Sequence, residues 1–279
     1  MTGHGDIEVV PLTPTIGAEV RGVDLREPVA DAMKAIEEAL YEHLVLFFRD
    51  QDITPEQQIA FARWFGPIEH HGYATAHPDH PDLVVLDVTN PSGLGTDQWH
   101  SDSSGKPEPA MGAVLRAVQV PDIGGDTCWS NMYAAYDALS EPMRRMLDGM
   151  TALHEFAKPL EQAINAGYQS PVTLEQIRSQ YPPIEHPVVR THPATGRKCL
   201  YVNHNYTTRI CQLGAEESNV LLPFLVDHVQ RPDFQVRFSW RPGSVALWDN
   251  RCTQHYALAD YGGHRRVMHR VSIAGDRPF

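Results

Sequence analysis

The sequence Trp99-His100-Ser101-Asp102 carries the first chemical signal in this chain, and the other segments are best understood in relation to it. On a strand, residues two positions apart point to the same face, so His100 and Asp102 can both reach one metal ion. The alternative for such a pair is an ordinary exposed strand end. A metal site therefore needs a further ligand from another part of the chain.

We expect the further ligand in the distant segment Asn250-Arg251-Cys252-Thr253-Gln254-His255, which follows an apolar strand and a turn. A structural role is the alternative for His255, and His264 and His269 compete with it as ligands. Two histidines and one carboxylate with open coordination positions are the ligand set of non-haem Fe(II) oxygenases. We therefore predict that His255 joins the first two ligands at one metal ion.

Two arginines in the last predicted strand suggest an anion site. Arg266 and Arg270 are four positions apart, so they share one face of the strand. If that face is interior, the two guanidiniums can bind a carboxylate or sulfonate, and the alternative is a solvated strand face. Thr127 follows a Gly-Gly-Asp turn. Its hydroxyl is either an ordinary strand side chain or a hydrogen-bond donor to the same anion as Arg266.

The composition of the chain limits the expected binding partners and the expected cellular compartment. The 279 residues carry a net charge of -12 without a block of Lys and Arg, so nucleic acid and anionic membranes are not expected partners. No apolar run approaches the roughly 20 residues that span a bilayer, and no apolar leader segment is visible. The four cysteines form no C-x-x-C pair. Reduced thiols in a cytoplasmic protein are therefore expected.

Short strands with Gly and Pro turns, together with a few helices, predict a mainly β sandwich or barrel with helices packed on one side. The predicted helices cover 30–43, 54–65, 132–139, 141–147, 173–180 and 215–229, and Pro223 should kink or end the last one. The main predicted strands cover 44–48, 83–86, 113–120, 127–130, 187–191, 199–203, 234–240, 245–248 and 266–273. No repeat or linker divides the chain, so residues 1–279 are predicted to form one domain.

Two segments are predicted to be lid-like, residues 70–97 and residues 158–187. Both are irregular in sequence, and the second is rich in proline. Long irregular segments in a compact domain are often lids or binding loops. His71 and Tyr73 lie in the first of them, where binding loops usually occur. They are predicted substrate contacts, and a polar cluster within the loop is the alternative.

Taken in order, these segments resemble the taurine dioxygenase family of Fe(II)/2-oxoglutarate-dependent dioxygenases, which includes taurine, alkylsulfate and aryloxyalkanoate dioxygenases. The likeness extends over nearly the whole chain. It is carried by residues 17–25, 58–66, 99–102, 124–127, 248–255, 260–261, 265–270, 275–276 and 278–279. Trp248 to His255 is the most specific part.

The resemblance implies a double-stranded β-helix (a cupin-like jelly roll) with flanking α-helices. It implies that Fe(II) is bound by His100, Asp102 and His255. It assigns Thr127 and Arg266 to the distal carboxylate of 2-oxoglutarate, and Arg270 to the other carboxylate or to the anionic end of the substrate. His71 and Tyr73 are similar to substrate-contact positions of the family.

The implied activity uses O2 to hydroxylate a small anionic organic substrate, which is a sulfonate, a sulfate ester or a carboxylate. Cleavage of a bond between carbon and a heteroatom can follow the hydroxylation. The resemblance also implies a homodimer or a homotetramer. The alternatives are a cupin-type metal hydrolase or isomerase and a non-catalytic 2-oxoglutarate-binding protein. Dependence on 2-oxoglutarate separates the hydrolase or isomerase from the other two, because it needs neither the arginine pair nor Thr127.

Overall fold

The computed structural model describes residues 7–70, 75–89, 96–165, 167, 170 and 172–279. Its helices are α1 Ala30–His43, α2 Pro55–Arg63, α3 Met132–Asp137, α4 Glu141–Leu147, α5 Ala157–Asn165, α6 Leu174–Gln180 and α7 Ala215–His228. Its strands are β1 Glu8–Pro11, β2 Ala18–Arg21, β3 Val45–Phe48, β4 Ala76–His77, β5 His80–Val88, β6 Gly112–Gln119, β7 Thr127–Asn131, β8 Thr151–His154, β9 Ile184–Pro187, β10 Val189–Thr191, β11 Lys198–Leu200, β12 Thr207–Ile210, β13 Gln235–Phe238, β14 Val245–Asp249, β15 Thr253–Ala257 and β16 Arg266–Ile273.

The centre of the fold is an eight-stranded sheet, called here the large sheet, in the order β1-β2-β3-β14-β6-β16-β5-β4. A three-stranded sheet in the order β13-β7-β15, called here the small sheet, faces it. The groups β12-β8-β9 and β10-β11 extend the fold beside the small sheet. Neighbouring strands of the large sheet are antiparallel except β2 and β3. The expected mainly β architecture with flanking helices is therefore confirmed.

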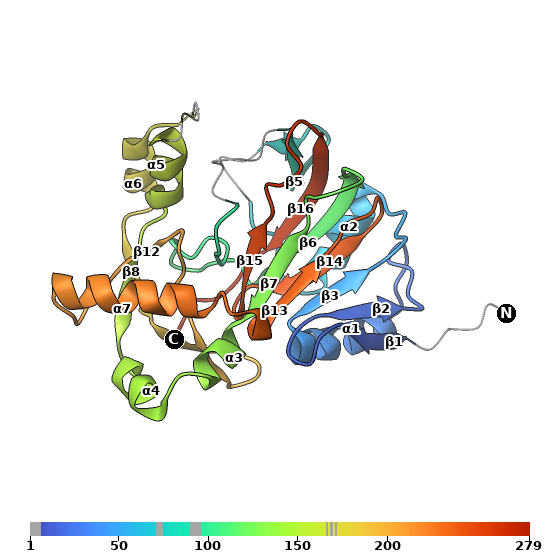
Figure 1. Ribbon diagram of the computed structural model, residues 1–279. Coiled ribbons are helices and arrows are strands. Elements are labelled where there is room, and N and C mark those ends of the chain that lie inside the picture. Colours follow the sequence, from blue (N-terminus) through green and yellow to red (C-terminus); the bar gives the residue numbers. More distant parts are fainter. Residues whose placement is uncertain (1–6, 71–74, 90–95, 166, 168–169, 171) are drawn as a thin grey trace.

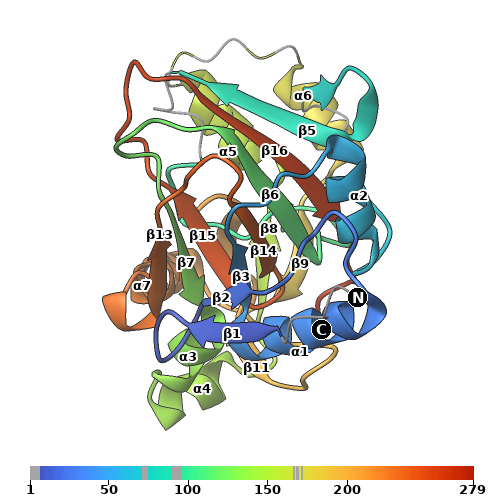
Figure 2. The ribbon, with the colours of Figure 1, turned by 90° about the vertical axis from the view of Figure 1, so that its right-hand side faces the viewer.

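Both faces of the large sheet are buried at β3, which explains the continuous apolar run of this strand. Val45 and Phe47 point into a core shared with the small sheet. Leu46 and Phe48 point into a second core, where Ile36 and other side chains of α1 and α2 pack. Figure 2 shows these two helices on one side of the large sheet and the small sheet on the other. A cavity lined by Leu115, Trp129 and Trp248 lies in the first of these two spaces.

The helix signals read from the sequence are confirmed at α1 and α2. The α1 stripe is buried through Met33, Ile36 and Leu40. At α2, Thr54 and Gln57 form a reciprocal capping box, and proline occupies the first turn. Side-chain periodicity and capping are local properties, so the sequence alone was sufficient for these elements.

Two expectations were wrong. The first is the possible end of helix α7 at Pro223: the helix continues through this residue, and its Leu222 and Leu225 pack into the first core on both sides of the proline. A kink at Pro223, the other outcome expected there, stays a prediction. The segment 158–187 contains a second helix, α5, in addition to α6. Pro159 lies in the first turn of α5, where its missing N–H costs no intrahelical hydrogen bond.

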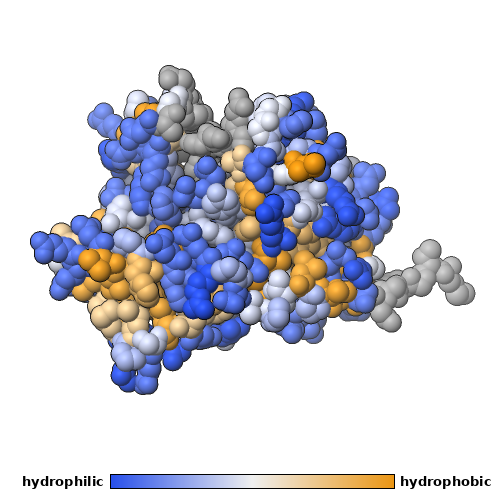
Figure 3. Space-filling model, viewed as in Figure 1, coloured by the Kyte–Doolittle hydropathy of each residue, from blue (hydrophilic) through white to orange (hydrophobic). Residues whose placement is uncertain are grey.

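The surface of α7 carries large apolar side chains, and apolar residues gather over this helix in Figure 3. Val220 is 74% exposed and Phe224 is 47% exposed. The homodimer or homotetramer expected from the resemblance stays a prediction. Within the described ranges, no helix has both the length and the apolar character needed to cross a membrane.

Candidate metal and anion site

His100 and His255 are brought together by the backbone. They form a single antiparallel bridge, with N–H···O distances of 3.1 Å from His100 to His255 and 2.8 Å in the other direction. Their ring centroids are 4.2 Å apart. The Nδ1 atom of His100 lies 2.7 Å from the carbonyl oxygen of Gln98. Because a carbonyl only accepts, Nδ1 carries the proton and Nε2 keeps a free lone pair.

Asp102 does not lie on a strand with His100, and that expectation was wrong. The strand pairing ends at His100, and Asp102 begins a turn. The side chain of Asn250 holds this turn, because its Oδ1 accepts from the Asp102 N–H at 2.7 Å and its Nδ2 donates to the Asp102 carbonyl at 3.0 Å. Nδ2 also donates to the carbonyl of Ala110 at 2.9 Å. The carboxylate therefore reaches the site through an amide clamp and not through strand alternation.

The three candidate ligands fit a metal ion. Asp102 Oδ1 lies 3.8 Å from His100 Nε2 and 3.7 Å from His255 Nε2. Two ligands at about 2.1 Å from one ion can be at most about 4.2 Å apart, so these distances are compatible. All three residues are buried. Burial lowers the pKa of His100, and lowers that of His255 to about 3, so both imidazoles are neutral and can offer a lone pair.

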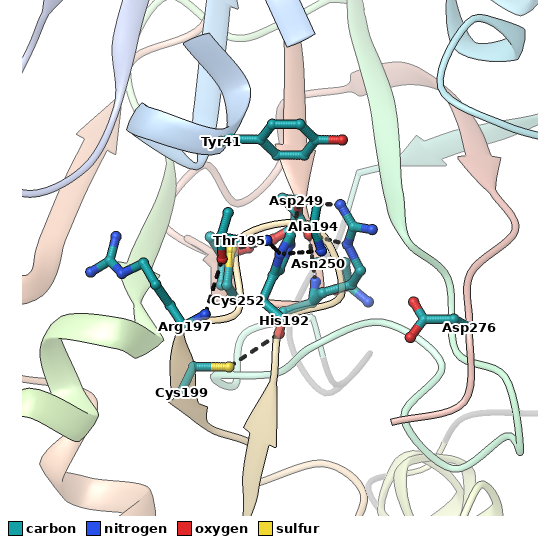
Figure 4. A network of polar contacts seen from close by, with 12 residues as sticks. Tyr41, His192, Ala194, Thr195, Arg197, Cys199, Asp249, Asn250, Cys252 and Asp276 are labelled. Atoms are coloured by element: carbon teal, nitrogen blue, oxygen red, sulfur yellow. Dashed lines mark hydrogen bonds and ion pairs between the residues drawn. The ribbon is translucent and has the colours of Figure 1, made fainter. Parts of the chain in front are cut away.

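The turn that carries Asn250 rests on a buried ion pair. Asp249 is 1% exposed, and Arg251 donates to it through Nη2 at 2.6 Å and Nε at 2.9 Å. His192 Nε2 lies 3.0 Å from Asp249 Oδ2, the oxygen that also accepts from Arg251 Nη2. Burial opposes the ionisation of Asp249, but Arg251 and His192 hold its pKa below the ordinary value. Figure 4 shows Asp249, Asn250 and Cys252 gathered around His192.

His192, Asp249 and Cys252 are also close enough to suggest a metal site. However, His192 Nδ1 accepts from the backbone N–H groups of Ala194 and Thr195, at 3.3 and 3.1 Å. The proton of this imidazole is therefore on Nε2, where it is donated to Asp249. No lone pair of His192 is left for an ion. We interpret this cluster as the support of the turn between β14 and β15.

We predict that Asn250→Ala lowers the free energy of unfolding by about 2–3 kcal/mol, because it leaves buried backbone groups without partners. It should also weaken metal binding roughly tenfold, because the Asp102 turn loses its clamp. Urea unfolding and calorimetric titration with Mn(II) measure the two effects. The control is Asn219→Ala on the exposed surface of α7, which should change neither. Equal metal affinity in wild type and Asn250→Ala would show that the turn holds its shape without the clamp.

A cavity of about 270 Å³ adjoins the metal ligands between the large and small sheets. Its lining includes His100, Thr127, Trp248, His255, Arg266 and Arg270. Both arginines line this cavity, so they share one face of β16, as predicted from their spacing. That face is the interior one, and the alternative of a solvated strand face was wrong. His264, by contrast, is exposed, and His269 packs against His77 with 5.7 Å between ring centroids. The competing ligands are thus directed away from the site.

Arg266 is an incompletely paired buried cation. Its side chain is 8% exposed, its Nε donates to the carbonyl of Gly125 at 3.2 Å, and its Nη2 has no hydrogen-bond partner among the described residues. A Cβ at Gly125 would lie 3.2 Å from Arg266 Cδ, and the φ of +71° also favours glycine there. Burial lowers the pKa of the guanidinium, which nevertheless remains charged. A buried charge with a free N–H next to a cavity calls for an anion.

Arg270 forms an ion pair with the second carboxylate oxygen of Asp102, at 2.7 Å. Its guanidinium carbon also lies 5.9 Å from the centroid of the Trp248 ring. From the sequence, Arg270 was expected to contact the cosubstrate or the substrate. Its ion pair with Asp102, a candidate metal ligand, was not predicted. The predicted substrate contacts His71 and Tyr73 lie outside the described residues.

The loop after Asp102 is held by a buried histidine. His186 is 1% exposed, and its Nε2 lies 2.9 Å from the carbonyl oxygen of Lys106. Burial lowers the pKa of His186 from 6.5 to about 4. Between pH 4 and pH 6.5, His186 is protonated in the unfolded chain and neutral in the folded chain. This contribution to stability is therefore complete above pH 6.5 and is lost on acidification to pH 4.

We predict that the metal-free protein loses up to about 3 kcal/mol of unfolding free energy through His186 between pH 6.5 and pH 4. His186→Gln keeps an N–H donor but does not titrate, so it should remove this part of the pH dependence. Urea unfolding at several pH values measures the slope. His264→Gln at an exposed position is the control. If the slopes of wild type and His186→Gln coincide, the histidine is protonated in the folded protein.

Two histidines and a carboxylate with open positions are the ligand set of non-haem iron oxygenases, and here they adjoin a cavity lined by two arginines. Residues 8–272 match the taurine catabolism dioxygenase TauD, TfdA family, and the chain belongs to this family. It is 37% identical over 284 residues to the alpha-ketoglutarate-dependent sulfate ester dioxygenase of Pseudomonas putida, which covers 98% of this chain and 91% of that protein.

Two solved structures are similar over at least 90% of their length. A taurine dioxygenase from Burkholderia xenovorans has a TM-score of 0.84 and 36% identity, covering 98% of this chain and 90% of that one. The crystal structure of AAD-2 in complex with Mn(II) and N-oxalylglycine has a TM-score of 0.82 and 32% identity, covering 98% of both chains. The cosubstrate class predicted from the sequence is therefore confirmed at the level of the family.

Proposed function

We propose that this dioxygenase hydroxylates a small anionic organic substrate, and that a sulfate ester or a sulfonate is the first class to test. The observation that carries the proposal is the direct junction of a buried His-His-Asp cluster with a cavity in which Arg266 has an unpaired N–H. The relatives named above act on a sulfate ester and on taurine, which is a sulfonate. A carboxylate substrate belongs in the same test.

We infer that the large and small sheets are the two halves of a double-stranded β-helix, and that residues 1–279 form one domain. The facing of the two sheets across one apolar core supports this. In this arrangement β7 and β15 supply Thr127 and His255 from one side of the cavity, while β16 supplies Arg266 and Arg270 from the other. The site is thus assembled from both sheets, which explains why its residues are scattered in the sequence.

In the proposed mechanism, His100 Nε2, Asp102 Oδ1 and His255 Nε2 hold Fe(II). When bound, the iron supplies the activation of O2 coupled to decarboxylation of 2-oxoglutarate to succinate. Arg266 and Thr127 bind and orient the distal carboxylate of 2-oxoglutarate. Arg270 holds the second oxygen of Asp102 at 2.7 Å, so that the first oxygen remains directed at the histidines. Arg270 also lines the cavity, so the guanidinium N–H groups not used by Asp102 are available to an anionic group of the cosubstrate or the substrate.

The product depends on the atom next to the hydroxylated carbon. If that carbon carries a sulfate ester oxygen, the hydroxylated product breaks its carbon–oxygen bond to give an aldehyde and sulfate. If it carries a sulfonate sulfur, the carbon–sulfur bond breaks to give an aldehyde and sulfite. Apolar cavity walls, including Leu86, Leu115 and Trp248, exclude water from the reacting atoms.

We propose that the segment 158–187 acts as a lid. Lys106, four positions after Asp102, pairs with Glu69 at 2.5 Å. Its Nζ lies 5.6 Å from the ring centroid of Phe156, just before α5, and 5.4 Å from that of Tyr181, just after α6. The two helices are joined by an ion pair at their surface. The residues that flank α5 and α6 thus contact Lys106, in the loop that follows the candidate metal ligand Asp102. The lid-like role of the segment 70–97 stays a prediction, because its residues 71–74 and 90–95 lie outside the described residues.

The test is an anaerobic titration of the protein with Fe(II) and then with 2-oxoglutarate. A visible charge-transfer band is expected, and sulfate esters, sulfonates and aryloxyalkanoates are then screened by the shift of that band and by succinate formation in air. A protein that binds iron but gives no band supports a cupin-type hydrolase or isomerase instead. A band without succinate for any anion supports a non-catalytic 2-oxoglutarate-binding protein.

A further inference from the structure

Trp240 lies next to both Thr127 and Arg266, the two residues assigned above to the distal carboxylate of 2-oxoglutarate. It follows β13 and is 7% exposed. Its indole Nε1 donates to Thr127 Oγ1 at 3.0 Å, and its ring centroid lies 5.9 Å from the guanidinium carbon of Arg266. We propose that Trp240 is a positioning residue that makes this end of the cavity selective for a carboxylate. The inference rests on the proposed function and extends it to the choice of cosubstrate.

The first part of the argument is the polarity of one hydrogen bond. An indole N–H can only donate, whereas a threonine hydroxyl has one proton and two lone pairs. Trp240 therefore occupies a lone pair of Thr127 and leaves its proton for another group. No second protein partner of this hydroxyl occurs among the described residues. Since Thr127 lines the cavity, its proton is available to an acceptor bound there.

The second part concerns the orientation of Arg266. Its guanidinium lies within about 6 Å of two aromatic rings, at 5.9 Å for Trp240 and 6.0 Å for Tyr261. Its Nε is already used by the carbonyl of Gly125. The guanidinium is thus fixed by Gly125 and by the two rings, while its Nη2 has no hydrogen-bond partner among the described residues. One fixed cation and one fixed hydroxyl donor, both prepared by Trp240, match the two oxygens of a carboxylate.

The neighbouring tryptophans provide a contrast. Trp129 and Trp248 line the cavity itself, and their indole nitrogens are buried without a hydrogen-bond partner in the described part of the chain. A change at either of these two residues would reshape the cavity, so neither can serve as a control. Trp64 is 49% exposed and does not line this cavity. Trp64→Phe makes the same chemical change as Trp240→Phe away from the site and is the control.

The experiment compares two 2-oxo acids of equal chain length on the iron-loaded protein without oxygen. 2-Oxoglutarate has the distal carboxylate and 2-oxopentanoate does not, and the chelate band reports the Kd of each. Trp240→Phe should weaken 2-oxoglutarate about five- to tenfold and change 2-oxopentanoate less than about twofold. Trp64→Phe should leave the ratio of the two Kd values as in wild type. In a Thr127→Val background, Trp240→Phe should cause a smaller loss of that ratio than in wild type, because the two changes remove one shared interaction.

A second variant protects the test against misfolding. Benzothienylalanine at position 240 replaces the indole N–H by sulfur with nearly the same shape, and it should reproduce the loss in the Kd ratio. If wild type forms a normal band and the benzothienylalanine variant keeps the wild-type ratio of the two Kd values, the positioning role of Trp240 is wrong. The proposed function is not affected by that result. Absence of the band in iron-loaded wild type overturns the proposed function together with this inference.

Discussion

His255→Ala is expected to abolish the band formed with Fe(II) and 2-oxoglutarate and to reduce turnover below detection. The imidazole is one of three protein donors around the candidate ion, with its Nε2 3.7 Å from Asp102 Oδ1. Changes at residues that merely support a ligand cost about 10–100-fold in metal affinity, so loss of a ligand should cost more than about 100-fold. Calorimetric titration with Mn(II) measures the affinity without turnover.

The exposed His264 offers the control for this experiment. The sequence left it open as a competing ligand, and the structure places it on the surface. His264→Ala should bind metal and turn over substrate as wild type does. If His255→Ala kept its metal affinity, or if both variants lost it equally, the proposed ligand set would be wrong.

Arg266→Met is expected to raise the Kd for 2-oxoglutarate about 100-fold. A charge-assisted pair with a carboxylate contributes about 3 kcal/mol, which corresponds to this factor. Metal affinity should stay unchanged, because Arg266 contacts none of the candidate ligands. The ligand-free protein should be as stable as wild type or more stable, because an incompletely paired buried charge is removed. The chelate band measures the Kd, and urea unfolding measures the stability.

Arg265 is the matched control, because it is the preceding residue and faces the other way. It is exposed and pairs with Asp87 at 2.6 Å. Arg265→Met should leave the Kd for 2-oxoglutarate unchanged. Similar effects of the two substitutions would mean that overall charge, and not the buried carboxylate contact, governs binding of the cosubstrate.

The elements that could be predicted are those with local causes. The stripe of α1 and the capping box of α2 both follow from neighbouring residues. Arg266 and Arg270 share a face because the side-chain period of a strand is two. The continuation of α7 through Pro223 could not be predicted, because the packing of the helix against the core outweighs the loss at one position.

The sequence by itself determined the residue types of the site and their order, since the residues around His100, Thr127, His255 and Arg266 together identify the family. Only the tertiary structure decided how they meet. His100 lies beside His255 through backbone hydrogen bonds, and Asp102 is held by Asn250 from 148 positions away. Trp240 reaches Thr127 across the small sheet. These contacts depend on hydrogen-bond partners and on burial that exist only when distant strands pair, so they could not be predicted from any local sequence pattern.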